Sequence, residues 1–477
     1  MASANSPAPS LYAPREPIFP RRVSGFFRSM KWWIMGVTLG IYYLTPWIRW
    51  DRGPDLPDQA VLVDLAGRRF FFFWIEIWPH EFYFIAGLLI MAGLGLFLFT
   101  SALGRVWCGY ACPQTVWTDL FILVERWVEG DRNARIRLLN QKYDLRKTRL
   151  RLTKWTLWLL IAVATGGAWV FYFADAPTLA KALATGEAHP VAYISIAVLT
   201  ATTFVFGGFM REQVCIYMCP WPRIQAAMMD EATLTVAYRD WRGEPRGKHL
   251  KRAEKPLGDC IDCNACVAVC PMGIDIRDGQ QMECITCALC IDACDDVMHR
   301  LGRERGLIDY LSLADEKIER EGGKAAALWK RIFRPRVLIY TAAWSAVGLG
   351  LLFALFIRSD LDLNASAVRN PVYVTLSDGS IRNAYDLRIR NKTGGARTFR
   401  LSVSADEVLR IDLEGTDETR VTVPADETFS QRVYVIARAA DPAAGAEGVE
   451  IRFWAEDVES GERAHANSRF RGTGDAP

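Results

Sequence analysis

Eight cysteines between residues 260 and 294 have the spacing of iron–sulfur ligands. They form two copies of C-x2-C-x2-C-x3-C, a run in which three cysteines of one copy and the last cysteine of the other hold each cluster. A short coil can wrap three corners of a cubane, so the fourth thiolate must come from the partner copy. The spacing predicts two 4Fe-4S clusters, the first on Cys260, Cys263, Cys266 and Cys294 and the second on Cys284, Cys287, Cys290 and Cys270.

A zinc site and a disulfide framework are the alternatives for this segment. Zinc ligands usually come as separated pairs, and disulfides do not suit a cytoplasmic loop. Pro271 follows the first copy, as the ferredoxin pattern expects, whereas Asp295 follows the second. Because proline is not a ligand, this departure leaves the prediction of two clusters unchanged.

Four further cysteines form a second repeat, C-x3-C-P, which pairs Cys108 with Cys112 and Cys215 with Cys219. Residues four apart share one face of a helix, and the proline after each pair disfavours helical geometry at the preceding cysteine. If the two repeats are neighbours, four sulfurs converge. Soft thiolates select Cu(I), zinc or iron–sulfur clusters. A dithiol relay and ordinary buried thiols are the other interpretations.

Five apolar stretches have about the 20 residues that a bilayer-crossing helix needs, and each C-x3-C-P repeat follows one of them. The predicted spans are 32–49, 82–103, 155–174, 190–210 and 337–357. Aromatic residues mark their ends, as at membrane interfaces. The apolar fraction of 51% and the 17 tryptophans agree with spans joined to polar domains.

Basic residues predict the orientation in the membrane. The segments 104–154 and 211–336 carry eleven and twenty Lys and Arg, against three in 50–81 and one in 175–189. Because basic loops stay on the cytoplasmic side, the N-terminus, both C-x3-C-P repeats and the ferredoxin-like segment are predicted to be cytoplasmic. The predicted location is a bacterial inner membrane, with the C-terminal domain in the periplasm.

Three connecting segments carry further predictions. Residues 129–153 are basic and are predicted to form an amphipathic helix on anionic lipid headgroups, rather than to bind nucleic acid. Residues 308–322 are predicted to form a short amphipathic helix. The run 70–78 is too short to span and should lie at the outer interface or pack against the bundle. Nearby Glu76, His80 and Glu81 are either ordinary interfacial polar groups or a metal or quinone contact.

From about residue 362 the apolar residues recur with a period of two. Short alternating runs separated by turn residues are typical of an antiparallel sandwich of the immunoglobulin kind. Six such runs are predicted to be strands, at 372–376, 385–391, 398–403, 419–423, 431–438 and 449–456. This part has no cysteine and one histidine, His465, so it is predicted to be a docking module rather than a catalytic domain.

The predicted fold is therefore a multi-domain membrane protein: a five-span α-helical bundle, an inserted two-cluster ferredoxin-like domain and a C-terminal all-β sandwich. The predicted parts are a disordered basic N-terminus (1–31), spans one to four (32–235), the ferredoxin-like domain (236–310), a linker (311–336), span five (337–357) and the sandwich (362–477).

Nearly the whole chain resembles the cytochrome c oxidase accessory proteins called CcoG, FixG or RdxA. The resemblance rests on the two C-x3-C-P repeats, the ferredoxin pair, C-I-T-C-A-L-C-I-D-A-C-D-D-V-M, F-F-F-F-W-I-E-I-W-P-H-E and D-G-S-I-R-N-A-Y-D-L-R-I-R-N-K. It implies a cupric reductase with two 4Fe-4S clusters that supplies Cu(I) for assembly of the cbb-type oxidase. Oxidase subunits or copper chaperones and transporters are the implied partners. The chain is also similar, more distantly, to membrane subunits of quinol dehydrogenases that feed periplasmic nitrate reductase.

Our leading hypothesis is electron transfer from an unidentified cytoplasmic donor, through the clusters, to Cu(II) held by the four cysteines of the C-x3-C-P repeats. One alternative is a quinol-oxidising subunit in which those cysteines are structural. The other is a non-enzymatic copper-binding scaffold for oxidase assembly. Residue chemistry alone leaves copper reduction and quinol oxidation open, and only the resemblance ranks copper reduction first.

Overall fold

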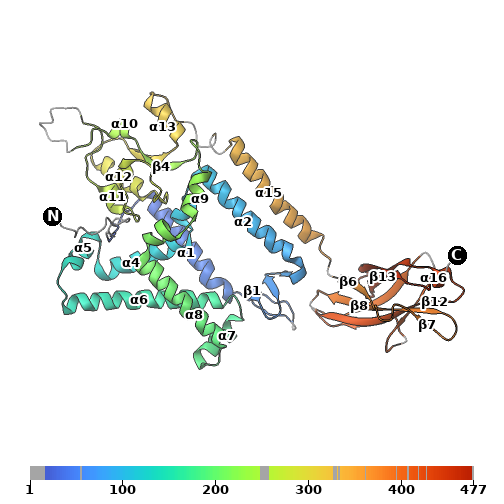
Figure 1. Cartoon of the computed structure of the whole chain (residues 1–477). Coiled ribbons are helices and arrows are strands. Elements are labelled where there is room, and N and C mark those ends of the chain that lie inside the picture. The colour runs from blue at the N-terminus through green and yellow to red at the C-terminus, as the bar shows by residue number, and fades with distance from the viewer. Residues whose placement is uncertain are drawn as a thin grey trace, which may run out of the picture. The chain divides into compact units, whose positions relative to one another are not determined.

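The computed structural model describes residues 17–53, 56–247, 257–325, 330, 333–359, 361–393, 395–405, 408–416, 418–425 and 427–474. The chain divides into two compact units, a helical unit and a β-sandwich unit (Figure 1). The helical unit comprises Met1–Ile48 and Gln59–Leu351, and the sandwich unit comprises Arg49–Asp58 and Leu352–Pro477.

Three helices in the described part of the chain are long and apolar enough to cross a membrane. They are α2 (Phe82–Leu103), α8 (Pro190–Thr203) with its π-helical continuation η3 (Phe204–Met210), and α15 (Pro335–Phe356). Helices α1 (Phe26–Leu44) and α6 (Leu145–Val170) occupy the other two predicted stretches but do not meet this measure. Three apolar helices are thus shown, and a bundle of five spans remains a prediction.

Buried charges explain why α1 and α6 are less apolar. In α1, Arg28 and Lys31 are buried against Asp119 of α4 (Pro113–Glu129). In α6, Lys154 pairs with Glu129 at 2.8 Å. The predicted first span also ends too late, because α1 stops at Leu44 and a 3-10 turn, η1 (Thr45–Trp47), follows it.

Small residues allow close helix packing. A Cβ on Gly87 of α2 would lie 2.5 Å from a Leu351 methyl carbon of α15. In the same pair of helices, which run side by side (Figure 1), Trp344 Nε1 donates to the Met91 carbonyl at 3.1 Å. Gly208 of η3 lies against the ring of Trp158 in α6.

Residues 61–77 form a small antiparallel sheet of β1 (Val61–Asp64), β2 (Arg69–Phe72) and β3 (Ile75–Ile77). The aromatic run is therefore mostly strand, which the sequence analysis did not predict. Glu76 accepts from Arg69 at 3.2 Å and Glu81 accepts from the Trp78 amide at 3.1 Å. Both carboxylates have structural partners, and the His80 side chain lies outside the described residues.

Two connecting segments differ from their predictions. The segment 129–153 is not one helix: α5 (Arg132–Asn140) ends before α6, whose first turn is capped by the Asp144 carboxylate accepting from the Lys147 amide. The segment 308–322 begins as strand β5 (Ile308–Leu311), and helix α13 (Leu313–Arg320) follows. Strand β5 is required because it pairs antiparallel with β4 (Thr235–Tyr238) and closes the cysteine-rich segment.

The cysteine-rich segment carries two helices, α11 (Ala265–Val269) and α12 (Leu289–Arg300). Three short elements connect it to the bundle: α3 (Val106–Tyr110), the π-helical η4 (Val214–Met218) and α9 (Trp221–Met228). The remaining short elements of the helical unit are η2 (Pro79–Glu81), α7 (Ala176–Thr185), α10 (Asp240–Gly243) and η5 (Ile276–Asp278).

The sandwich unit consists of two antiparallel sheets. One has the order β10-β12-β8-β6 with β7 on β8, and the other has the order β11-β9-β13-β14. The strands are β6 (Leu361–Ala367), β7 (Val374–Thr375), β8 (Ile381–Asn391), β9 (Arg397–Ser404), β10 (Arg410–Leu413), β11 (Arg420–Val423), β12 (Thr428–Ala437), β13 (Val449–Asp457) and β14 (Arg463–Phe470), with the short α16 (Pro442–Gly445).

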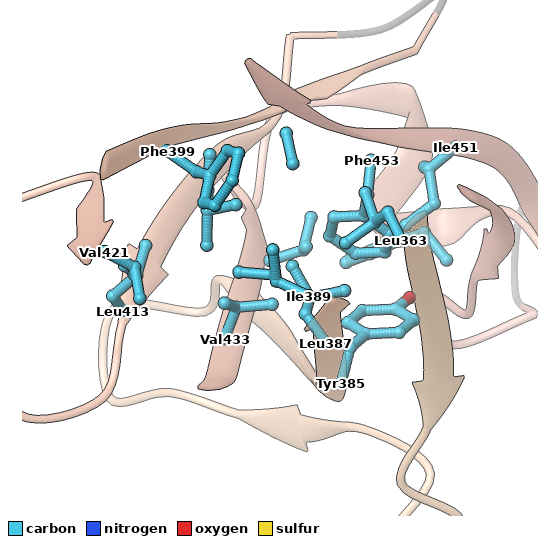
Figure 2. Close-up of a cluster of buried hydrophobic side chains, with 14 of the residues drawn as sticks. Leu363, Tyr385, Leu387, Ile389, Phe399, Leu413, Val421, Val433, Ile451 and Phe453 are labelled. Atoms are coloured by element: carbon cyan, nitrogen blue, oxygen red, sulfur yellow. The ribbon is translucent and has the colours of Figure 1, made fainter. Parts of the chain in front are cut away.

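Alternation along these strands buries one apolar row from each sheet (Figure 2). Tyr385 of β8 and Phe453 of β13 pack edge-on with ring centroids 4.9 Å apart. The Tyr385 hydroxyl donates to the Arg469 carbonyl at 3.0 Å, so the buried ring leaves no polar atom unpaired.

Candidate metal centre

Four cysteines line one small cavity in the cysteine-rich segment; together they are called the first cysteine set. They are Cys260, Cys263, Cys266 and Cys294. Three of them are buried, whereas Cys263 is exposed. The fourth member comes from α12, at the end of the other sequence copy.

A second small cavity is lined by the second cysteine set, which is Cys270, Cys284, Cys287 and Cys290, and also by Cys266 of the first set. Within the second set, Cys270 comes from the first sequence copy and the other three from the second. Both cavities thus bring cysteines of the two sequence copies together, and the exchanged assignment of four ligands to each cluster stays a prediction.

The backbone between the cysteines is alike in the two copies. Asp262 and Asn264 in the first copy, and Thr286 and Ala288 in the second, all have left-handed φ values of 52° to 59°. Such residues turn successive N–H groups into one concavity, an arrangement found at many iron–sulfur sites. Left-handed backbone is unfavourable for residues other than glycine, so its repetition in both copies indicates a requirement of the site.

The donor sets fit a cluster better than a single ion. No three His, Cys, Asp or Glu side chains in the described ranges lie close enough to hold one metal ion. A cubane holds its four thiolates farther apart than a single ion does, so this spacing agrees with clusters. Burial raises the pKa of Cys266 to about 11 and those of Cys270 and Cys294 to about 12. Binding of a cluster must therefore displace the protons of these thiols.

The four cysteines of the C-x3-C-P repeats, called the thiol site, are partly buried neighbours. Burial, followed by the charges of Cys112, Cys108 and Cys219, raises the pKa of Cys215 to about 12. Both repeats leave regular α-helix: the Cys112 amide donates to the Trp107 carbonyl at 2.9 Å, and the Cys219 amide donates to the Val214 carbonyl at 2.8 Å. The two cysteines of each pair therefore do not lie four apart on a regular α-helix. The chain forms a wider turn at the second cysteine, where the following proline disfavours helical geometry.

Polar groups hold Cys108 in place. Its thiol donates to Gln225 Oε1 at 3.1 Å, and Gln225 Nε2 donates to the Thr100 hydroxyl at 3.2 Å. Burial raises the pKa of the Cys108 thiol, and the Arg105 guanidinium opposes that shift. The sequence analysis did not single out Gln225, and no spacing signal marks it.

Helix α3 lies directly against the second cysteine set. A Cβ on Gly109 would be 2.6 Å from the Ile285 carbonyl oxygen and 3.0 Å from Cys287 Cα. The Tyr110 hydroxyl donates to the Cys287 carbonyl at 3.1 Å. Cys108 and Cys215 pack against the apolar cluster that contains Cys287. The thiol site is therefore next to the second set.

We expect Gly109→Ala to destabilise the protein by about 1–3 kcal/mol, as overpacking does. The atoms in its way belong to the backbone around Cys287 and have little freedom to move aside. Thermal unfolding of the full-length protein measures this effect. The control is Gly36→Ala in α1, which has open space around it and should be neutral or stabilising. Equal melting temperatures for the two variants would contradict the tight contact.

Asp292 connects the cysteine-rich segment to the first helix. It lies on α12, and its carboxylate accepts from the amides of Phe27 and Arg28 at 3.2 and 2.7 Å. These are amides of the first turn of α1, which have no partner within the helix. The contact joins residues more than 260 apart in the chain, and no local sequence pattern could have indicated it.

A buried group of charges supports the segment before the second thiol pair. Glu125 on α4 accepts from Arg135 and Arg211 and lies 3.6 Å from Lys154. Burial would raise the pKa of Glu125, but Arg211, Arg135 and Lys154 outweigh that effect and hold the pKa below its ordinary value. Arg211 lies one turn before Cys215, so its ion pair with Glu125 holds in place the segment that leads to Cys215.

Comparison with known proteins identifies the segments described above. A profile described as a 4Fe-4S dicluster domain matches residues 210–313, and one described as a 4Fe-4S binding domain matches 84–130. A profile described as an Ig-like fold at the C-terminus of FixG matches 351–473.

Three relatives are similar over almost their full lengths. Protein RdxB of Cereibacter sphaeroides is 71% identical over 99% of this chain and 100% of its own. Protein RdxA of the same organism is 64% identical over 97% and 98%, and the nitrogen fixation protein FixG of Rhizobium meliloti is 55% identical over 96% and 93%. The resemblance seen in the sequence is confirmed: this chain belongs to the FixG/RdxA family and is an iron–sulfur electron-transfer protein.

Proposed function

We propose that this protein is an oxidoreductase that reduces Cu(II) to Cu(I) at the thiol site, for assembly of a cbb-type cytochrome c oxidase. The observation that carries the proposal is the packing of α3 against the second cysteine set, through Gly109 and Tyr110. This contact brings four soft sulfur ligands next to an electron-transfer centre.

The chain's own residues supply binding and orientation. The thiolates of Cys108, Cys112, Cys215 and Cys219 bind the copper substrate, and sulfur ligands favour Cu(I) over Cu(II). Gln225 Oε1 accepts a hydrogen bond from the Cys108 thiol and so orients that sulfur. The two 4Fe-4S clusters, held by the first and second cysteine sets, supply single electrons when bound. Each Cu(II) ion takes one electron to become Cu(I).

The thiols must approach one another to hold copper. The described residues contain no preformed group of three ligands for one ion, so copper binding draws the two C-x3-C-P turns together. Release of Cu(I) then requires a partner with competing soft ligands.

The test replaces all four cysteines of the thiol site by serine in the full-length protein. The protein is reduced with dithionite and then desalted, so that no free dithionite remains to reduce copper directly. We expect Cu(II) reduction by the variant, measured by a Cu(I)-specific chromophore, to fall to the rate without protein. The absorption of both clusters should remain. Met218→Ser, an exposed change within the same turn as Cys215 and Cys219, is the control and should keep wild-type turnover.

Unchanged turnover in the four-serine variant would end the proposal. Loss of iron from that variant would also contradict it. That loss would mean that the thiol site holds an iron–sulfur cluster, as the description of the profile over 84–130 allows. Iron analysis of the same samples separates the two outcomes.

The sandwich unit has a place in the same proposal as a docking module for oxidase subunits or copper chaperones. Its apolar side chains are largely used in its own core, and it has no cysteine. The proposal places this unit on the periplasmic side of a bacterial inner membrane and the thiol site on the cytoplasmic side, as the basic loops predict.

A further inference from the structure

A cavity of about 440 Å³ lies where α2 and α15 end beside the cysteine-rich segment. Arg105, two residues after α2, is part of its wall, and so is Asp230. Asp230 accepts from Arg334 and, at 3.1 Å, from Arg336, which lie at the start of α15. The cavity is thus at the shared end of two helices that are apolar enough to span a membrane.

Of the described residues that line the cavity, Arg105 is the one cationic side chain, and it also interacts with the Cys108 thiol. Arg105 is 5% exposed, its Nη1 donates to the Met282 carbonyl, and its Nε has no hydrogen-bond partner among the residues that the structure describes. The carboxylates at the rim are already paired, Asp230 as above and Glu231 with Lys317 at 3.0 Å. A buried guanidinium N–H without a partner favours a ligand with an accepting oxygen.

The remaining wall joins apolar surface to the second cysteine set. Met229, Met282 and Leu313 supply apolar surface, and Gln280 and Thr235 supply neutral polar groups. Cys284 of the second set also lines the cavity. A molecule bound here would touch a ligand of the second cluster, which is a position for an electron donor.

We propose that this cavity binds the headgroup of a quinol, with a ring oxygen accepting from Arg105. A lipid-soluble donor reaches a cavity at the ends of membrane helices directly, and a planar ring with oxygen acceptors fits a largely apolar site with one buried donor. The inference rests on the proposed function, for which it names the electron donor. The quinol would break two O–H bonds, give two protons to water at the cavity mouth and become the quinone, and each of the two clusters, when bound, would accept one of its two electrons. Those electrons reduce two Cu(II) ions.

The test is photolabelling of the full-length protein in lipid nanodiscs with an azidoquinone. We expect label on peptides that contain Met229 or Met282, and we expect it to be removed by excess menadione. Gln280 is exposed and lines the cavity, so the larger side chain of Gln280→Trp should narrow the cavity. Arg105→Gln removes the buried cation. Each should lower the labelling at least tenfold. Arg300→Gln is the matched control, because Arg300 is exposed and pairs with Asp296 on α12, outside the cavity wall.

Equal labelling of all variants, or label that does not map to the cavity wall, would overturn the inference. Gln280→Trp keeps the test valid if Arg105→Gln fails to fold. Cu(II) reduction by unlabelled wild-type protein that has been reduced with dithionite and desalted is measured in parallel and does not need a quinol. If the protein does not reduce Cu(II) in this assay, the proposed copper activity is wrong. If it reduces Cu(II) but is not labelled by the azidoquinone, only the quinol site is wrong.

Discussion

Glu125→Ala should destabilise the helical unit by about 3–5 kcal/mol, the range for breaking a buried ion pair from one side. The substitution leaves the buried Arg135 and the partly buried Arg211 without their main carboxylate partner. Denaturant unfolding of the full-length protein in detergent measures the change. Since Arg211 leads into the turn that carries Cys215, the variant should also lose order at the thiol site, which thiol-alkylation rates will report.

Glu231→Ala is the matched control for this prediction. Glu231 pairs with Lys317 at 3.0 Å, but both side chains are about two-thirds exposed, and exposed pairs contribute at most about 1 kcal/mol. If the two variants lost similar stability, the burial of Glu125 would not be what makes its ion pairs important.

Cys270→Ala should remove the second cluster although Cys270 lies in the first sequence copy. Cys270 lines the same cavity as Cys284, Cys287 and Cys290, so the remaining three thiols cannot complete four ligands. We expect iron to fall from about eight to about four atoms per chain. The electron paramagnetic resonance spectrum of the reduced protein should match that of Cys290→Ala.

Cys294→Ala should give the complementary result and match Cys260→Ala, since those two cysteines line the other cavity. Val267→Ala, next to a cysteine but not a ligand, should keep both signals. A Cys270→Ala spectrum that matched Cys260→Ala instead would show that each copy holds its own cluster.

Cysteine spacing was the most informative signal in the sequence. The two runs of C-x2-C-x2-C-x3-C predicted a two-cluster segment, which the match to a 4Fe-4S dicluster domain over 210–313 confirms, whereas the exchanged ligand sets stay a prediction. The six alternating runs of the C-terminal part likewise coincide with strands of the sandwich, because a half-buried strand needs period two. The missed strands β6, β10 and β14 are short or rich in polar residues, such as R-A-H-A-N-S-R-F in β14.

The membrane part was harder to predict because apolar length does not reveal buried charge. Arg28 and Lys31 at the start of α1 are indistinguishable in sequence from an ordinary basic flank, yet both are buried on Asp119. Strand β5 was read as helix because four residues cannot show a period, and only its pairing with β4 defines it. Gly109 lies visibly between two cysteines, but its contact with Cys287 depends on tertiary structure.

The contact of α3 with the second cysteine set places the thiol site and that set in the same folded chain. Ferredoxins usually meet their acceptors by diffusion, so their transfer rates depend on protein concentration and on ionic strength. Here the hydrogen bond of Tyr110 and the close backbone contact at Gly109 hold the thiol site and the second cysteine set together in one folded unit. If electrons pass between them as proposed, that transfer would be a first-order step within one molecule, with a rate independent of protein concentration and insensitive to salt.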